Sequence, residues 1–258
     1  MRAADPDDPV AVTRRSYNLI AASYEERTAS PAEEFVAWRA EWAAAVRDAA
    51  PARSGARAGG APARDGAPGG AVPARSGAPG DAAPARSGAP GTAAAPVVLD
   101  AGAGPGQHTE ALATAGLRAV ALDLSREMAL RARRRGVPVV LGDQRRLPFG
   151  DGTFDGVWSS AALLHVPRED VPATLGEWRR VTRPGGLLAL STATGGTDGW
   201  EDPPYDTAGE HPPPRWFVYH DEAPLRALLD AAGWAVASVG TRPGAMRDWL
   251  QVRAVARG

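Results

Sequence analysis

From residue 97 onward, short apolar runs alternate with amphipathic stretches, and this alternation restricts the fold more than any other feature of the sequence. The apolar runs typical of strands are 97–100, 118–123, 137–142, 154–160 and 187–192. Helices are predicted between them at 107–115, 125–135 and 170–182. Because parallel strands are joined by right-handed helical crossovers, this order predicts an α/β fold with a doubly wound, mainly parallel sheet and helices on both faces.

The end of the chain is predicted to complete this sheet. A helix is expected at 220–232, followed by strands at 234–239 and 249–256. The sheet would then contain seven strands, five from the alternating region and two from this final part of the chain.

A proline-rich repeat separates this region from the N-terminus. Between 51 and 96 the chain repeats with a period of 11 residues, and the repeats begin at Pro51, Pro62, Pro73 and Pro84. Helices do not survive proline and glycine at this density, and the repeat has few large apolar residues to bury. The sequence therefore predicts an N-terminal helical lid at 1–50, a disordered tether at 51–96 and a ligand-binding domain at 97–258.

Two helices are predicted before the tether, at 12–28 and 31–50. Ser30 is expected to cap the second helix, and Pro31 suits its first turn. Large apolar side chains recur on one face of this helix, at Phe35, Trp38 and Trp42.

Composition excludes several kinds of chemistry. The 258 residues include no cysteine, and all 29 basic residues are arginine. This excludes Schiff-base lysines, thiolate nucleophiles and cysteine-ligated metals. A net charge of −1 offers no broad basic surface for nucleic acid, and no histidine–carboxylate spacing favours a metal site. No apolar run approaches the roughly 18 to 20 residues needed to span a bilayer, and a signal peptide is absent, so a cytoplasmic protein is predicted.

A glycine-rich loop follows the first predicted strand. The strand ends in Asp100, and glycines stand at 102, 104 and 106 before a helix begins. Glycine lets the backbone turn sharply and approach a ligand, and the helix N-terminus behind it presents unpaired N–H groups. A dinucleotide fingerprint would place its third glycine at 107, where this chain has glutamine, so the spacing argues against pyrophosphate binding.

Carboxylates end the next two strands as well. Asp123 ends the second strand, where an acidic residue can accept hydrogen bonds from both hydroxyls of a ribose. Asp143, followed by Gln144, ends the third. Three successive strands thus deliver an aspartate to the edge at which open α/β sheets bind ligands.

At these residues the chain resembles the class I S-adenosylmethionine-dependent methyltransferases, and within them the small-molecule, ubiquinone/menaquinone-biosynthesis-like subgroup (methyltransferase type 11). The similar segments are VVLDAGAGPGQHTEAL, ALDLS, GDQRRLPFGDGTFDGVWSSAALLHV, EWRRVTRPGGLLALS and, at 17–27, YNLIAASYEER. The resemblance implies strand order 3-2-1-4-5-7-6, with strand seven antiparallel, and S-adenosyl-L-methionine as the cofactor.

The resemblance also implies roles for individual residues. The glycine loop would pack against the methionine part of the cofactor, with Asp100 orienting the loop or meeting the amino group. Asp123 would bind the ribose, Asp143 would accept from the adenine amine, and the two tyrosines of the N-terminal helix would reach the donor's carboxylate or the acceptor. The cofactor-binding residues expected are Tyr17, Tyr24, Asp100, Gly102, Gly104, Gly106, Asp123, Leu124, Met128, Asp143, Gln144 and Ser159. Met128 also suits a core position.

His165 is the candidate catalytic residue. It follows the fourth strand, next to the expected position of the methyl donor, where an imidazole could take a proton from the acceptor. A histidine that bonds local backbone is the alternative. The aromatic run at 205–219 is expected to close over an acceptor or to pack in the core. Asp202-Pro-Pro-Tyr205 matches the box of adenine methyltransferases, but it follows the fifth strand instead of the fourth, which disfavours adenine methylation.

The sequence therefore predicts methyl transfer to an oxygen, nitrogen or carbon of a small molecule, by a monomer or homodimer. Two alternatives remain open: a non-catalytic nucleotide-binding or interaction protein on the same fold, and an NAD-dependent oxidoreductase. Binding measurements with S-adenosylmethionine and NAD would separate them.

Overall fold

The computed structural model describes residues 8–50, 94–205 and 211–258. Of these, residues 8–50, 95–205 and 211–258 belong to one compact unit. The tether predicted at 51–96 lies outside the described residues except for 94–96. The division into lid, tether and ligand-binding domain stays a prediction.

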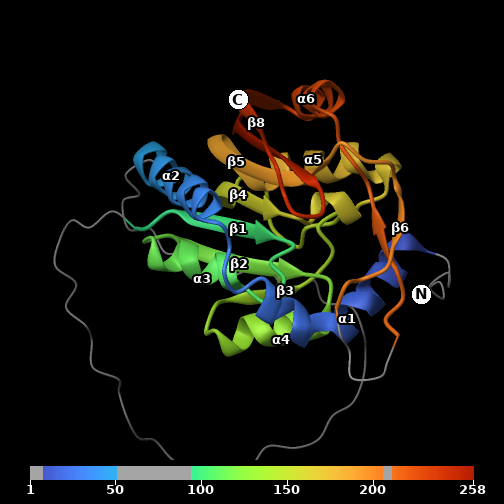
Figure 1. Cartoon of the computed structure of the whole chain (residues 1–258). Helices are drawn as coiled ribbons and strands as arrows, with labels where there is room; N and C mark the ends of the chain where they lie inside the picture. Colours follow the sequence, from blue (N-terminus) through green and yellow to red (C-terminus); the bar gives the residue numbers. More distant parts are fainter. Residues whose placement is uncertain (1–7, 51–93, 206–210) are drawn as a thin grey trace, which may run out of the picture. The chain divides into compact units, whose positions relative to one another are not determined.

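A seven-stranded sheet forms the centre of this unit (Figure 1). Its strands, in chain order, are β1 (Val97–Ala101), β2 (Arg118–Asp123), β3 (Val139–Leu141), β4 (Phe154–Ser160), β5 (Thr182–Thr194), β8 (Trp234–Arg242) and β9 (Asp248–Ala256). They lie in the order β3-β2-β1-β4-β5-β9-β8. β1 to β5 pair in parallel, and β9 runs antiparallel to both β5 and β8. Since β8 and β9 are the sixth and seventh strands of this sheet along the chain, the predicted order is confirmed.

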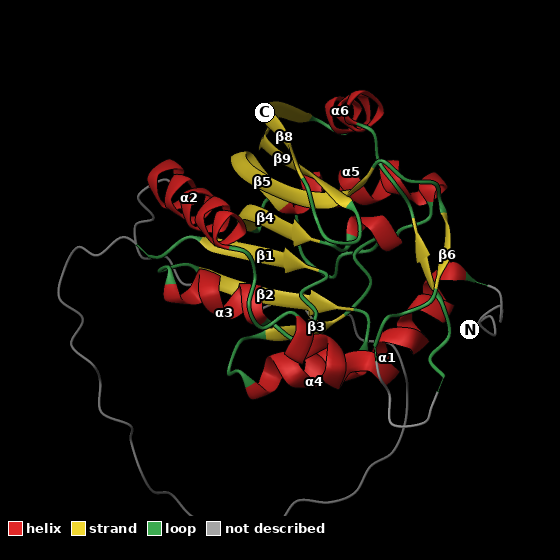
Figure 2. Ribbon diagram, in the orientation of Figure 1, coloured by secondary structure: helices red, strands yellow, loops and turns green. Residues whose placement is uncertain are grey.

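Helices cover both faces of the sheet (Figure 2). They are α1 (Pro9–Arg27), α2 (Glu33–Ala49), α3 (Gln107–Thr114), α4 (Arg126–Arg134), α5 (Val171–Val181) and α6 (Glu222–Ala231). Successive residues of a strand point to opposite faces. Val98 accordingly packs with Trp42 of α2 and Leu112 of α3, whereas Leu99 belongs to the core that contains Trp178 of α5. The two largest apolar cores among the described residues contain these side chains and hold the layers together.

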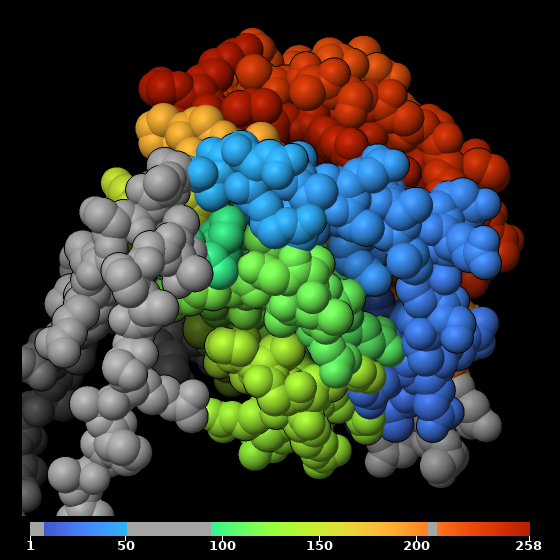
Figure 3. Space-filling model, turned by 90° about the vertical axis from the view of Figure 1, so that its left-hand side faces the viewer, coloured from blue at the N-terminus to red at the C-terminus, as the bar shows by residue number. Residues whose placement is uncertain are grey.

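Helix α1 lies beyond the carboxyl ends of β1 and β2, the ends toward which their arrows point in Figure 1. Pro9 occupies its first turn, and the Asp8 side chain caps it by accepting from the Val10 amide at 3.0 Å. In the space-filling view, the N-terminal helices (blue) lie directly against the segments that contain α3 and α4 (green) (Figure 3). The helix is thereby placed over the edge of the sheet where the predicted site lies.

The start of the second helix was predicted wrongly. The helix begins at Glu33, after an Ala32 cap that makes no side-chain hydrogen bond, so Ser30 does not cap it and Pro31 lies outside its first turn. The amides of Phe35 and Val36 bond to the Ala32 carbonyl instead. Phe35, in the first turn of the helix, is buried in the core with Trp42.

Two short strands were not predicted. β6 (Gly199–Glu201) and β7 (Arg215–Phe217) form a separate antiparallel pair between β5 and α6. Three residues are too few to show an alternating pattern, and three prolines directly precede β7 in the sequence. None of the described helices is long and apolar enough to cross a membrane.

Candidate functional site

A cavity with an empty volume of about 720 Å³, its open mouth included, lies at the carboxyl ends of β1 and β2. Ten of the thirteen predicted site residues line it: Tyr17, Tyr24, Gly102, Gly104, Asp123, Leu124, Met128, Asp143, Gln144 and His165. One wall comes from α1 and the opposite wall from the loops that follow the strands. The structure thus brings together segments separated by the whole proline-rich repeat.

The glycine loop is shaped by backbone angles that favour glycine. Gly102 has φ 76° and Gly106 has φ 82°, both in the left-handed region. A Cβ at Gly102 would lie 2.2 Å from the Ala162 Cβ, and one at Gly106 would lie 2.9 Å from the Ala132 Cα. Neither position has room for a side chain, so the loop packs tightly against the β4 loop on one side and α4 on the other.

Asp123 joins this loop to the end of β2. Its Oδ2 accepts from the Gly104 amide at 2.7 Å, and its Oδ1 accepts from the Ser125 amide at 2.8 Å. Burial raises the pKa of its carboxyl to about 6, although these amides oppose the rise. The carboxylate is therefore held in one orientation at the cavity wall.

Three predicted site residues lie behind the cavity instead of lining it. Asp100 is buried and accepts from the Thr109 hydroxyl at 2.7 Å, which ties β1 to the first turn of α3. The buried Ser159 hydroxyl donates to the Ala101 carbonyl at 3.1 Å. Gly106 packs on α4. These contacts fit a role in orienting the loop.

The carboxylate of Asp143 is already engaged. Arg145 donates to it from both its backbone amide and its guanidinium, and the same guanidinium bonds to Asp170 at 2.7 Å. Gln144 donates to the Ala162 carbonyl at 3.1 Å. Arg145 also lines the cavity and was not predicted; the only signal in the sequence is its place two residues after the strand-end aspartate.

The cavity lining also contains a hydrogen-bonded tyrosine and histidine. Tyr17 Oη lies 2.7 Å from His165 Nε2, and His165 Nδ1 lies 2.6 Å from the Trp216 carbonyl oxygen. A carbonyl only accepts, so Nδ1 carries the proton. Burial lowers the pKa of the imidazole to about 3, so the ring is neutral and Nε2 accepts from the Tyr17 hydroxyl. Both ring nitrogens are thus occupied, and the backbone partner matches the alternative considered for this histidine.

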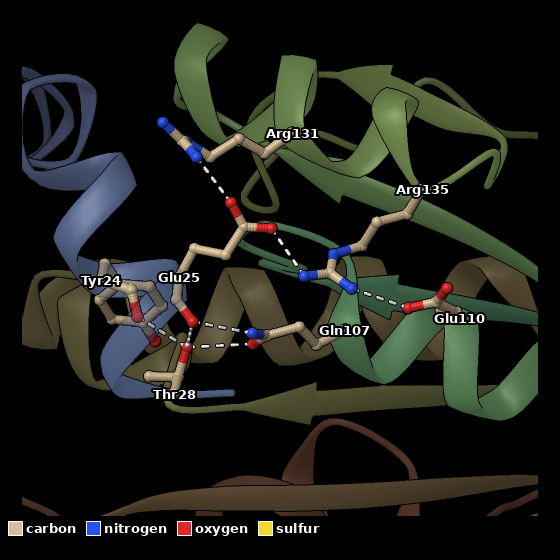
Figure 4. Close-up of polar contacts among 7 residues, drawn as sticks. All are labelled: Tyr24, Glu25, Thr28, Gln107, Glu110, Arg131 and Arg135. Atoms are coloured by element: carbon tan, nitrogen blue, oxygen red, sulfur yellow. Dashed lines mark hydrogen bonds and ion pairs between the residues drawn. The ribbon is translucent and has the colours of Figure 1, made fainter. Parts of the chain in front are cut away.

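The far end of α1 is fastened by an ionic contact with two helices (Figure 4). The Glu25 carboxylate bonds to Arg131 of α4 and to Arg135, the residue that follows α4, at 2.6 Å in each case. Arg135 also bonds to Glu110 of α3 at 2.8 Å. The Gln107 amide donates to the Glu25 carbonyl at 3.0 Å, next to the glycine loop. Among the described residues no group of acidic or histidine side chains could hold a metal ion.

The buried carboxyl of Asp100 predicts a pH dependence of stability. Burial raises its pKa to about 7, from an ordinary 3.8. Between these values the folded protein holds a proton that the unfolded chain has released, so this group makes the free energy of unfolding fall as the pH rises from about 4 to about 7. We expect Asp100→Asn to reduce that slope, measured by thermal melting at several pH values. An unchanged slope would contradict the raised pKa.

Comparison with known proteins identifies the family. Residues 99–190 match the methyltransferase domain family. A demethylmenaquinone methyltransferase of Mycolicibacterium gilvum (strain PYR-GCK) is 36% identical over 156 residues, which cover 54% of this chain and 68% of the relative. The chain belongs to the class I S-adenosylmethionine-dependent methyltransferases. The demethylmenaquinone methyltransferase of Corynebacterium urealyticum (strain ATCC 43042 / DSM 7109) is 45% identical over 94 residues, 36% of this chain and 40% of that protein.

Solved methyltransferase structures share the fold. The Burkholderia thailandensis 1,6-didemethyltoxoflavin-N1-methyltransferase, with bound 1,6-didemethyltoxoflavin and S-adenosylhomocysteine, is 27% identical, with a TM-score of 0.51 over 64% of this chain and 72% of that one. An S-adenosylmethionine-dependent methyltransferase of Methanosarcina mazei is 17% identical, with a TM-score of 0.56 over 64% of this chain and 93% of that one. This methyltransferase is therefore an enzyme that uses S-adenosyl-L-methionine and a small-molecule acceptor, which sets aside the oxidoreductase and the non-catalytic alternatives.

Proposed function

We propose that this methyltransferase transfers the methyl group of S-adenosylmethionine to an oxygen, nitrogen or carbon atom of a planar ring compound held under α1. The observation that carries the proposal is one cavity lined by Asp123 and the glycine loop on one wall and by Tyr17 and His165 on the other. Three aromatic side chains, Tyr17, Tyr24 and His165, line the α1 end, and flat rings pack well against an edge or face of this kind. The relatives described above are named for demethylmenaquinone and 1,6-didemethyltoxoflavin, which supports an acceptor of similar kind.

The cofactor is proposed to lie along the sheet edge. Asp123 would accept from the ribose hydroxyls, and Asp143 with Gln144 would meet the adenine. Leu124 and Met128 offer apolar contact beside them. The glycine loop has no side chains that would keep a ligand away from its backbone. This fits a close approach of the methionine part of the cofactor to the loop.

The chain's own residues then have a limited task. When bound, S-adenosylmethionine supplies a methyl group on a sulfonium, which is already a good leaving group. The protein has to hold the acceptor atom in line at about 3 Å and to exclude water. We assign the exclusion of water to α1 and the placing of the acceptor to Tyr17 and His165. Proton removal by His165 stays a prediction, and its lowered pKa makes it a weak base.

Calorimetric titration tests the proposed cofactor, and label transfer tests the proposed chemistry. We expect S-adenosylmethionine and S-adenosylhomocysteine to bind, and NAD not to compete with them. Transfer of a labelled methyl group to 1,4-dihydroxynaphthalene and to a panel of nitrogen heterocycles would then identify the acceptor atom. Binding of NAD in place of S-adenosylhomocysteine would refute the proposal.

We infer that α1 acts as a lid and that the ion pairs of Glu25 hold it in the closed position. Glu25→Gln removes the charge that pairs with both Arg131 and Arg135, so we expect faster amide hydrogen exchange across 14–28 in the free protein. S-adenosylmethionine should slow exchange there in the wild type, because cofactor binding favours the closed position. Glu26→Gln is the matched control, because Glu26 is the adjacent residue and is exposed. Equal exchange rates in the two variants would show that the ionic contact does not hold the helix.

A further inference from the structure

A buried arginine lies directly behind the acceptor end of the cavity. Arg215, the first residue of β7, is only 4% exposed. Its Nη1 donates to Tyr17 Oη at 3.2 Å, and Tyr17 lines the cavity. The guanidinium is therefore one hydrogen bond away from the space that we assign to the methyl acceptor.

No carboxylate among the described residues forms an ion pair with this guanidinium. Arg247 provides the comparison: its side chain is 8% exposed and bonds to the Glu201 carboxylate at 2.7 Å. The buried Nε of Arg215 has no hydrogen-bond partner in the described part of the chain. A buried charge without a counter-ion is strongly unfavourable, so a ligand that brings one would be stabilised here.

The groups around Arg215 neutralise it only in part. Its guanidinium lies over the rings of Tyr17, Tyr205 and Phe217, with the central carbon 5.1 to 5.5 Å from the ring centres. Ring faces attract a cation, but more weakly than a carboxylate does. Burial raises the pKa of the Tyr17 hydroxyl from its ordinary value of 10, so this phenol stays uncharged at neutral pH. The Glu201 carboxylate lies opposite Arg215 in the β6–β7 pair, and the charges of Arg247 and Arg215 both lower its pKa. Two guanidinium groups thus share one carboxylate, and the local charge is positive.

A second cation lies on the same helix as Tyr17. Arg14, one turn before Tyr17 on α1, lines the cavity and forms no ion pair with the residues that the structure describes. The carboxylates in the cavity lining are those of Asp123 and Asp143, and Arg145 pairs with the second of them. Arg14 therefore adds positive charge to the part of the lining that α1 provides.

We propose that Arg215 and Tyr17 form the recognition site for a negatively charged oxygen of the methyl acceptor, a carboxylate or an ionised hydroxyl. Arg215 is a positioning residue: it donates to the Tyr17 oxygen and supplies the positive charge. Tyr17 makes the contact, and its hydroxyl proton, which bonds to His165 Nε2 in this structure, turns to the bound oxyanion. This rests on the proposed function and narrows its acceptors to planar anions.

Calorimetry on protein saturated with S-adenosylhomocysteine tests this assignment, with 2-naphthoate and its neutral, nearly isosteric amide, 2-naphthamide, as probes. We expect the wild type to bind the carboxylate about tenfold more tightly than the amide, the gain typical of a charge-assisted hydrogen bond. Arg215→Gln should abolish this preference, and Arg215→Lys should retain part of it. Arg247→Gln, a buried arginine that has its own carboxylate, is the control and should keep the preference. Equal binding of the two probes by the wild type, or no binding of either, would overturn the proposal.

A second measurement distinguishes the acceptor's oxyanion from the carboxylate of the cofactor. 5′-Methylthioadenosine lacks that carboxylate, so the ratio of its affinity to that of S-adenosylhomocysteine should be the same in the wild type and in Arg215→Gln. If the ratio changes while the naphthoate preference does not, Arg215 serves the cofactor and the proposal is wrong. Failure of the wild type to bind S-adenosylhomocysteine would instead refute the proposed function.

Tyrosine resonances report the contact even if the glutamine variant folds poorly. The chain has four tyrosines, so labelling their Cζ atoms gives four signals, and Tyr17→Phe assigns the relevant one. We expect 2-naphthoate to shift the Tyr17 signal in the wild type, whereas 2-naphthamide should not. A Tyr17 signal that does not shift when 2-naphthoate binds would rule out the hydrogen bond from Tyr17 to the carboxylate.

Discussion

Asp123→Ala is expected to weaken the binding of S-adenosylmethionine by about 1.5 to 3 kcal/mol, which is about 10- to 150-fold in Kd. The substitution removes the charged acceptor that we assign to the ribose hydroxyls. It also removes the partner of the Gly104 amide, so the glycine loop loses a tie to β2. Calorimetric titration of the folded variant measures the loss.

Two further substitutions separate these causes. Asp123→Asn keeps a side-chain oxygen that can accept from one amide but removes the charge, so an intermediate affinity is expected. Asp48→Ala changes an exposed aspartate of α2, far from the cavity lining, and should leave the Kd unchanged. Wild-type affinity in Asp123→Ala would remove this residue from the binding site.

Gly102→Ala is expected to destabilise the fold by about 2 to 5 kcal/mol. A left-handed backbone costs a residue with a Cβ about 1 to 2 kcal/mol, and an overpacked contact costs about 1 to 3 kcal/mol more. The contact is the added Cβ at 2.2 Å from the Ala162 Cβ. The loop is expected to shift and cofactor binding to fall with it, measured by thermal melting and calorimetry.

Gly136→Ala is a closely matched control. Gly136 has the same φ of 76°, but nothing lies within 4 Å of the Cβ that alanine would add. It should therefore show the backbone cost alone, about 1 to 2 kcal/mol. If both variants melt at the same temperature, the contact with Ala162 does not restrict the loop.

The chain order of strands, glycines and carboxylates could be predicted because each signal is local. The residues 118–123 and 154–160 were predicted as strands with the bounds that the structure has, because short segments with apolar residues that alternate with helical stretches are typical of strands. Asp123 and the glycine loop line the cavity for the same reason: the carboxyl ends of neighbouring parallel strands meet at one edge. The resemblance to a known family added the strand order, which no local pattern contains.

The acceptor end of the cavity was decided by tertiary structure. The Tyr17 and His165 side chains that bond there are 148 residues apart, and Tyr17 and Arg215 are 198 apart. The periodicity of α1 does not predict which of its faces contacts β7, because a helical pattern indicates only that one face is apolar. Arg215 looks like any other arginine in a chain that uses arginine alone as its basic residue.

The sequence by itself determined the sheet, the loop and the carboxylates at its edge, because these depend on backbone angles and on spacings of a few residues. The tertiary structure alone decided which ring nitrogen of His165 carries the proton, and that Arg215 is buried. A carbonyl from β7 orients the histidine, and rings from three segments enclose the guanidinium. Charge, burial and hydrogen-bond direction at such a site depend on segments that meet only when the chain has folded. For this reason no sequence motif predicts the residues to which we assign recognition of the acceptor.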